Sequence, residues 1–129
     1  MWKKIFQGKN IMEQQLIQFT FTLLNQVKLF HWATKSYAAH KALGDLHDLL
    51  SESFDDLVEC YIGSTGKTLG VFEVKSECTS DLKQVLPRLK SAGQTMRRMR
   101  SDIKMSELQN KIDELLGALD KTYYLLNLN

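Results

Sequence analysis

The sequence predicts an all-α protein that folds as one antiparallel four-helix bundle. Apolar residues recur at steps of three and four over most of the 129 residues, which is the spacing of amphipathic helices. Four such segments follow one another, and the only long connection separates the second from the third. No internal repeat and no strand pairing competes with this pattern. A chain of this length fits a single domain, residues 1–129, in which 1–10 form a short N-terminal tail.

The first two helices are expected over residues 11–33 and 36–62. In each helix one face gathers the residues that would enter the core. These positions are Met12, Leu16, Phe19, Leu23, Val27 and Phe30 in the first helix, and Leu43, His47, Leu50, Phe54, Leu57 and Tyr61 in the second. The glycine-marked segment from Gly63 to Lys75 then provides the long connection.

The third and fourth helices are expected over residues 80–103 and 106–126. Their core positions are Leu82, Val85, Leu89, Met96 and Met99, followed by Leu108, Ile112, Leu115, Leu119, Tyr123 and Leu126. Pro87 falls inside the third segment, so that helix either starts later or is kinked. Ser106 followed by Gln109 fits a capping box at the start of the fourth.

Composition and charge indicate a soluble protein of the cytoplasm. The two cysteines, Cys60 and Cys78, are too few for a disulfide framework. The N-terminus lacks the apolar core of a signal peptide, and no later run reaches membrane-spanning length, so we expect no membrane partner.

DNA is not favoured as a partner either. The net charge of +2 does not by itself indicate nucleic acid. The densest basic cluster is Arg97, Arg98 and Arg100, and the N-terminal tail adds only three lysines. Binding to phosphates needs several cations presented together.

Polar residues form a stripe along one flank of the second helix. Placed at about 100° per residue, Asp48, Asp55 and Glu59 lie on this flank, and His40 lies between it and the core face. The first helix carries a second apolar strip of Ile17, Phe21 and Leu24 near His31. This strip is either a wide core face or a subunit interface, and we favour the interface, in a homodimer or a larger homo-oligomer.

The residues on this flank resemble a known signature. His31-Trp32 is followed by Tyr37-x-x-His40, and His40 by fourteen residues, Asp55, three residues and Glu59. This pattern is similar to that of the Dps-type mini-ferritins over about residues 20–63. The string from His31 to His40 is closer still to small ferritin-like proteins of phages and large DNA viruses.

The resemblance implies a ferritin-like bundle that binds iron between two subunits and oxidises or sequesters Fe(II). His31 and His40 of one chain would face Asp55 and Glu59 of its mate. Imidazole together with carboxylate is a common surrounding for redox-active iron. Beyond these metal ligands, it implies no catalytic or cofactor-binding residue. The chain departs from the family in its shorter interval between the two histidines and in Gly44, where the family has Asp.

A metal-free bundle that acts as a structural or interaction module is the alternative. The acidic stripe, including Asp48 and the more outward Glu52, would then be solvated or form ion pairs with a basic stripe of the third helix, made of Lys83, Lys90, Arg97 and Lys104. In this interpretation His47 is a buried, hydrogen-bonded histidine, and Trp32 packs at the helix end. The ferritin site inside one bundle is excluded, because it needs Glu-x-x-His spacings on two helices and no histidine follows His47.

Overall fold

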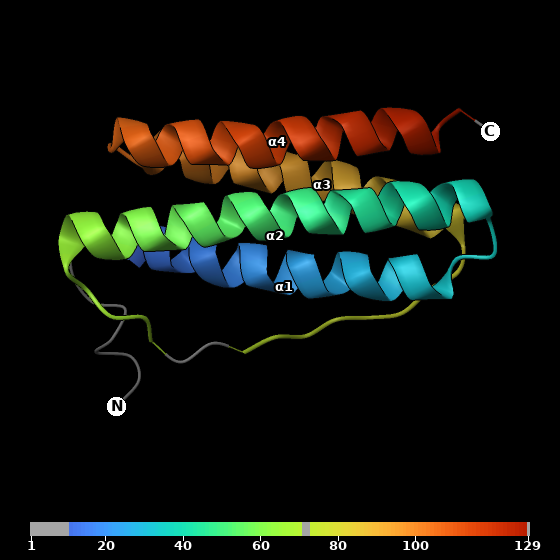
Figure 1. Ribbon diagram of the computed structural model, residues 1–129, viewed down its shortest axis with the longest axis horizontal. Helices are drawn as coiled ribbons and strands as arrows, with labels where there is room; N and C mark the ends of the chain where they lie inside the picture. Colours follow the sequence, from blue (N-terminus) through green and yellow to red (C-terminus); the bar gives the residue numbers. More distant parts are fainter. Residues whose placement is uncertain (1–10, 71–72, 129) are drawn as a thin grey trace.

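The computed structural model describes residues 11–70 and 73–128, and within them it contains four α-helices and no strand. The helices are α1 (Ile11–Ala33), α2 (Tyr37–Thr65), α3 (Leu82–Asp102) and α4 (Ser106–Leu126). They pack as an elongated bundle (Figure 1). The predicted all-α four-helix bundle is therefore confirmed. The expected tail at 1–10 lies outside the described residues.

The helices are connected by two short turns and one crossover. Residues 34–36 join α1 to α2, and residues 103–105 join α3 to α4. The connection from α2 to α3 runs along the length of the bundle, so these two helices point in the same direction (Figure 1). Helix α1 contacts α2 and α3, and α4 contacts the same two helices. Neighbours are therefore antiparallel, and α2 lies diagonally across from α3. One long crossover is the connectivity of ferritin-like bundles.

Helix α2 begins and ends at residues suited to those positions. The hydroxyl of Ser36 accepts a hydrogen bond from the Ala39 amide at 3.2 Å and caps the N-terminus. At the other end Gly66 has a φ of 67°, and its amide donates to the Ile62 carbonyl. The helix therefore continues to Thr65, three residues beyond the expected end. Gly66, and not Gly63, ends the helix, because Gly66 is the residue that adopts the left-handed conformation. Gly63 lies within the helix.

The start of α4 differs from the prediction. Met105 is the N-cap and makes no side-chain hydrogen bond, while Ser106 is already the first helical residue. Gln109 instead donates from Nε2 to the Ile103 carbonyl at 2.7 Å. The capping box is therefore not formed, because the chain enters the helix one residue too early for Ser106 to act as a cap. Helix α3 begins at Leu82, and the Asp81 carboxylate caps it by accepting a hydrogen bond from the Lys83 amide. Pro87 lies within this helix.

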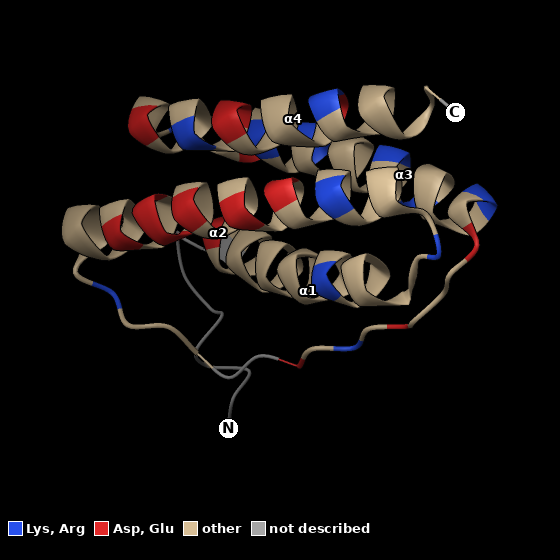
Figure 2. Ribbon diagram, turned by 45° about the vertical axis from the view of Figure 1, so that its right-hand side comes forward, with Lys and Arg blue, Asp and Glu red and all other residues tan. Residues whose placement is uncertain are grey.

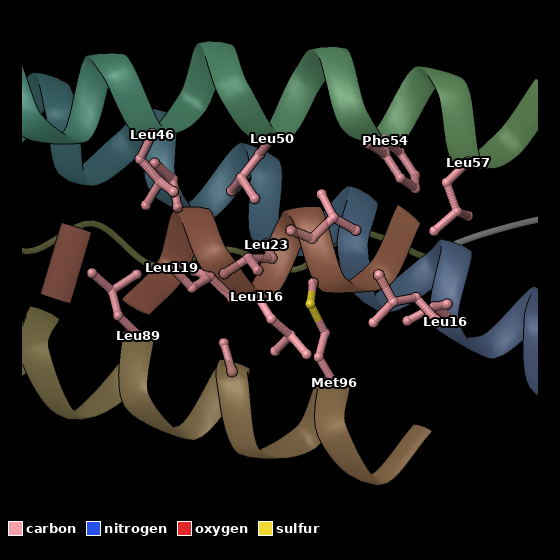
Figure 3. Packing of buried hydrophobic residues seen from close by; sticks show 14 of the residues in the cluster. Leu16, Leu23, Leu46, Leu50, Phe54, Leu57, Leu89, Met96, Leu116 and Leu119 are labelled. Carbon is pink, nitrogen blue, oxygen red and sulfur yellow. The ribbon is translucent and has the colours of Figure 1, made fainter. Parts of the chain in front are cut away.

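The core lies between the four helices, and leucine dominates it (Figure 3). Leu46 and Leu50 of α2 face Leu119 and Leu116 of α4, and Met96 of α3 packs from below. All five side chains are buried. This burial of apolar surface fixes how α1 and α2 sit against each other, and hence where the polar residues on their outer flanks lie. None of the described helices is long and apolar enough to cross a membrane.

Candidate metal centre

The two histidines of the signature lie together where α1 turns into α2. His31 is in the last turn of α1, and His40 is in the first turn of α2. Their rings stack with centroids 3.8 Å apart and planes inclined by 19°. The short turn at residues 34–36 brings the two helix ends into this contact. The prediction placed both histidines at one end of the bundle, and this is confirmed.

Each histidine is held by the backbone of the other. Nδ1 of His31 lies 2.6 Å from the carbonyl oxygen of His40, and Nδ1 of His40 lies 2.8 Å from the carbonyl oxygen of His31. A carbonyl oxygen only accepts, so both Nδ1 atoms must donate. In a neutral ring this leaves the Nε2 lone pair free. Histidines that bind metals are commonly fixed in this way, with the second nitrogen donating to a carbonyl or carboxylate.

Gly44 makes room for this arrangement. A Cβ atom added at Gly44 would lie 2.8 Å from Cε1 and 3.1 Å from Nδ1 of His31. Both distances are too short for a side chain to fit while the ring stays in place. The glycine that departs from the Dps pattern is therefore the residue that lets the His31 ring lie against the backbone of α2.

The predicted carboxylates lie further along α2. Asp55 and Glu59 are both exposed and one helical turn apart. The pKa of Glu59 is raised, first by a side-chain hydrogen bond with Asp55 and then by the negative charge of Asp55. Two adjacent carboxyl groups that favour a shared proton are also suited to share a cation.

The four predicted ligands do not meet within one chain. Asp55 follows His40 by fifteen residues, which is about 22 Å along a helix. Within the described part of the chain, no three His, Cys, Asp or Glu side chains gather closely enough to hold a metal ion. Two imidazoles and two carboxylates are thus presented separately on α2 and the adjoining end of α1.

The proposed ion pairing between α2 and α3 is wrong. Arg97 binds Asp120 at 2.7 Å and Arg100 binds Asp113 at 2.6 Å, so these arginines pair with α4. Helices α2 and α3 lie diagonally across the bundle and cannot exchange side-chain contacts of this kind. The basic residues of α3 therefore do not neutralise the acidic stripe.

In the part of the chain that the structure describes, the acidic stripe has no Lys or Arg partner, and its one contact with a basic side chain is between Asp48 and Nδ1 of His47, at 3.8 Å. Four of its exposed carboxylates have no Lys or Arg ion pair among the described residues, namely Asp48, Glu52, Asp55 and Glu59. They belong to the row of acidic residues along α2 (Figure 2). Like charges in such a row repel one another, so the stripe would gain from a bound cation.

A groove of about 660 Å³ runs beside this stripe between α1 and α2. Its walls are lined by Ile17, Phe21, Leu24, His47, Asp48, Ser51, Glu52, Phe54, Asp55, Val58 and Leu69. Phe21 is 40% exposed and stacks on Phe54, with ring centroids 6.3 Å apart. Ile17 is only 1% exposed, so it belongs to the core rather than to an exposed strip as predicted. The apolar strip that remains accessible consists of Phe21 and Leu24.

The surroundings of His47 and Trp32 differ from those predicted from the sequence. His47 is partly buried on the groove wall, and its Nδ1 has no hydrogen-bond partner among the described residues. Burial, followed by the charge of Lys28, lowers the pKa of His47. Trp32 is 66% exposed, with the Lys28 ammonium 5.5 Å from its ring, so it does not pack into the helix end.

Residues 31–126 match a family described as a family of unknown function, DUF5856, and the chain belongs to that family. The match begins at His31 and includes the turn, α2, α3 and α4. No curated protein and no solved structure matches the chain.

Proposed function

We propose that this protein binds Fe(II) at a site shared between two copies of the chain, where the ion is sequestered or loses one electron to a dissolved oxidant such as O2. His31 and His40 of one copy supply the imidazoles, and Asp55 and Glu59 of the other supply the carboxylates. The observation that carries this proposal is the reciprocal histidine pair, in which both Nδ1 atoms are engaged by carbonyls and both Nε2 atoms are left for a ligand.

A second copy is required by the distance along α2. An antiparallel pairing of two α2 helices about a two-fold axis brings the histidines of each chain to the carboxylates of the other. The point midway between His40 and the carboxylates falls between residues 47 and 50, beside the groove lined by Phe21 and Leu24. A dimer centred there would bury this apolar strip.

The stacked rings favour two ions over one. A metal ion bonds to an imidazole nitrogen close to the plane of the ring, at about 2 Å. Planes inclined by only 19° and stacked 3.8 Å apart do not direct both lone pairs at a single ion. Each imidazole would therefore hold its own Fe(II), and Asp55 and Glu59 of the other copy would supply carboxylate ligands. Carboxylates bind metal ions in their ionised form, so binding should weaken at a pH low enough to protonate Glu59, whose pKa is raised.

Anaerobic Fe(II) titration of two double variants tests the proposal. His31→Ala/His40→Ala and Asp55→Ala/Glu59→Ala should each lose Fe(II) binding on their own. In a mixed dimer one of the two sites regains all four ligands, so the capacity should return to about half that of the wild type. Glu107→Ala removes an exposed carboxylate of α4 outside the groove and is the control, so it should bind like the wild type. Wild-type binding by either double variant alone would show that these residues are not the iron site, and a wild type that binds no Fe(II) would favour a metal-free interaction module instead.

A further inference from the structure

The groove between α1 and α2 combines apolar side chains with one acidic wall. Phe21 and Leu24 line it from α1, and both remain accessible in a single copy of the chain. Asp48, Glu52 and Asp55 line it from α2, and none of them has a Lys or Arg partner among the described residues. Exposed apolar surface beside unpaired charges of one sign suits a segment that carries apolar and basic residues together.

The first ten residues of the chain have this composition. Their apolar and basic side chains are interleaved, in the order Trp2, Lys3, Lys4, Ile5, Phe6 and Lys9, and none of the ten is acidic. The segment lies outside the described residues and is joined directly to the start of α1. It is therefore complementary to the groove in both charge and polarity.

The start of α1 is close enough to the groove for this segment to reach it. Ile17 lines the groove and lies six residues after Ile11, the first residue of α1, which is about 9 Å along the helix. Residues 8–10 span about 10 Å when extended, so they can cover this distance. They include Gly8 and Asn10, and both residue types are common where a chain reverses direction.

The length of the groove matches the rest of the segment. Val58 and His47 both line the groove and are eleven residues apart on α2, which is about 16 Å. Residues 2–7 span about 20 Å when extended, so they can follow the groove over this length. A segment that enters at the Val58 end brings Lys3-Lys4 toward Asp48 at the other.

We propose that residues 2–7 occupy this groove in their own molecule. Their apolar side chains lie against Phe21 and Leu24, and their lysines lie against the acidic wall. This contact requires neither iron nor a second copy. A second copy that docks on the same apolar strip must displace the segment, so the segment opposes dimerisation in the absence of metal.

The fluorescence of Trp2 tests this contact in the full-length chain. Trp32→Phe leaves Trp2 as the only tryptophan, and a chelator keeps metal ions out. At a protein concentration that keeps the chain monomeric, Trp2 should emit at a shorter wavelength than in the urea-unfolded chain, because the groove shields the indole from water. Lys3→Glu/Lys4→Glu sets negative charges against the acidic wall, so it should release the segment and move the emission to that of the unfolded chain.

Two further variants separate this pairing from a general effect of charge. Adding Asp48→Lys/Glu52→Lys to the segment variant restores opposite charges, so it should return the emission of Trp2 to the shorter wavelength. Lys83→Glu/Lys104→Glu reverses two exposed charges outside the groove and should leave the emission unchanged.

Three results would overturn the proposal. The first is an emission of Trp2 that already equals that of the unfolded chain, and the second is an emission that Lys3→Glu/Lys4→Glu does not change. The third is a shift to shorter wavelength that appears only as the protein concentration rises, because the segment would then lie on a second copy. Each measurement is made without Fe(II), so none of these results bears on the proposed iron site.

Discussion

The imidazole of His31 lies directly over Gly44, at a place where a Cβ atom would approach Cε1 of His31 to 2.8 Å. This contact links the last turn of α1 to the backbone of α2. It lets the ring reach the carbonyl oxygen of His40 and stack on the ring of His40. The orientation of both histidines therefore depends on the absence of a side chain at position 44.

Gly44→Ala should weaken Fe(II) binding while leaving the bundle folded. The added methyl group displaces the His31 ring, which breaks the reciprocal hydrogen bonds that orient both Nε2 atoms. Loss of such supporting contacts costs about tenfold or more in metal affinity. Anaerobic Fe(II) titration measures this effect. Circular dichroism checks that the helices remain.

Gly117→Ala is the control for this experiment. Gly117 is exposed on α4, and a Cβ atom there would meet nothing within 4 Å. Alanine should stabilise the helix by about 0.5–1 kcal/mol and leave Fe(II) binding unchanged. Equal affinities for the two alanine variants would contradict the role assigned to Gly44.

Much of the fold could be predicted because the information is local. Apolar spacing directly marks the face that each helix buries, and a short turn places His31 beside His40. The role of Gly44 was not predicted, since it depends on how closely the α1 side chain approaches the α2 backbone. The burial of Ile17 was missed for a related reason. Helix α1 contacts both α2 and α3, so its buried arc is wider than one helix viewed alone suggests.

The ion pairs also depend on information that no single helix contains. The crossover places α2 diagonally across from α3, so Arg97 and Arg100 meet acidic residues of α4. The spacing of charges along α2 and α3 is compatible with pairing, but the topology prevents it. For this reason the acidic stripe of α2 forms no ion pair with the basic stripe of α3 among the described residues, although both stripes run along their helices at similar spacing.

Phe21→Lys should prevent self-association. Phe21 is 40% exposed on the groove wall, and a lysine there would place a charge in the centre of the proposed interface. Sedimentation equilibrium should show a dimer for the wild type and a monomer for the variant. Tyr124→Lys changes another exposed aromatic residue, on α4 and outside the groove, and should leave the dimer intact. A monomeric wild type would refute the interface.

Glu59→Gln should change how stability depends on pH. The folded protein raises the pKa of Glu59, so it favours the protonated carboxyl group beside Asp55. That contribution is fully present below the ordinary pKa of 4.5 and is lost as the pH rises through the higher, folded value. Glutamine is uncharged at every pH, so it never repels the Asp55 carboxylate.

The Tm of Glu59→Gln should therefore exceed that of the wild type by a margin that appears above pH 4.5 and grows as Glu59 ionises. Thermal unfolding between about pH 4 and pH 7 measures this margin. Glu107→Gln, which removes an exposed charge from the first turn of α4, should not show the same dependence. A difference in Tm between wild type and Glu59→Gln that stays constant with pH would contradict the raised pKa of Glu59.

Neutralising the acidic stripe away from the ligands should strengthen the metal-free dimer. Antiparallel pairing of two α2 helices brings Asp48 and Glu52 of one copy near those of the other, and neither has a Lys or Arg partner among the described residues. Their repulsion opposes assembly until cations bind, so removing it with Asp48→Asn/Glu52→Gln should lower the dimer Kd about tenfold in chelator. Asp45→Asn is the control, because Asp45 already pairs with Lys41 at 3.7 Å.

Fe(II) should tighten the wild-type dimer more than the dimer of the double variant, since binding and assembly are reciprocally linked. If the chelated wild type and double variant had the same Kd, α2 would not lie at the two-fold axis.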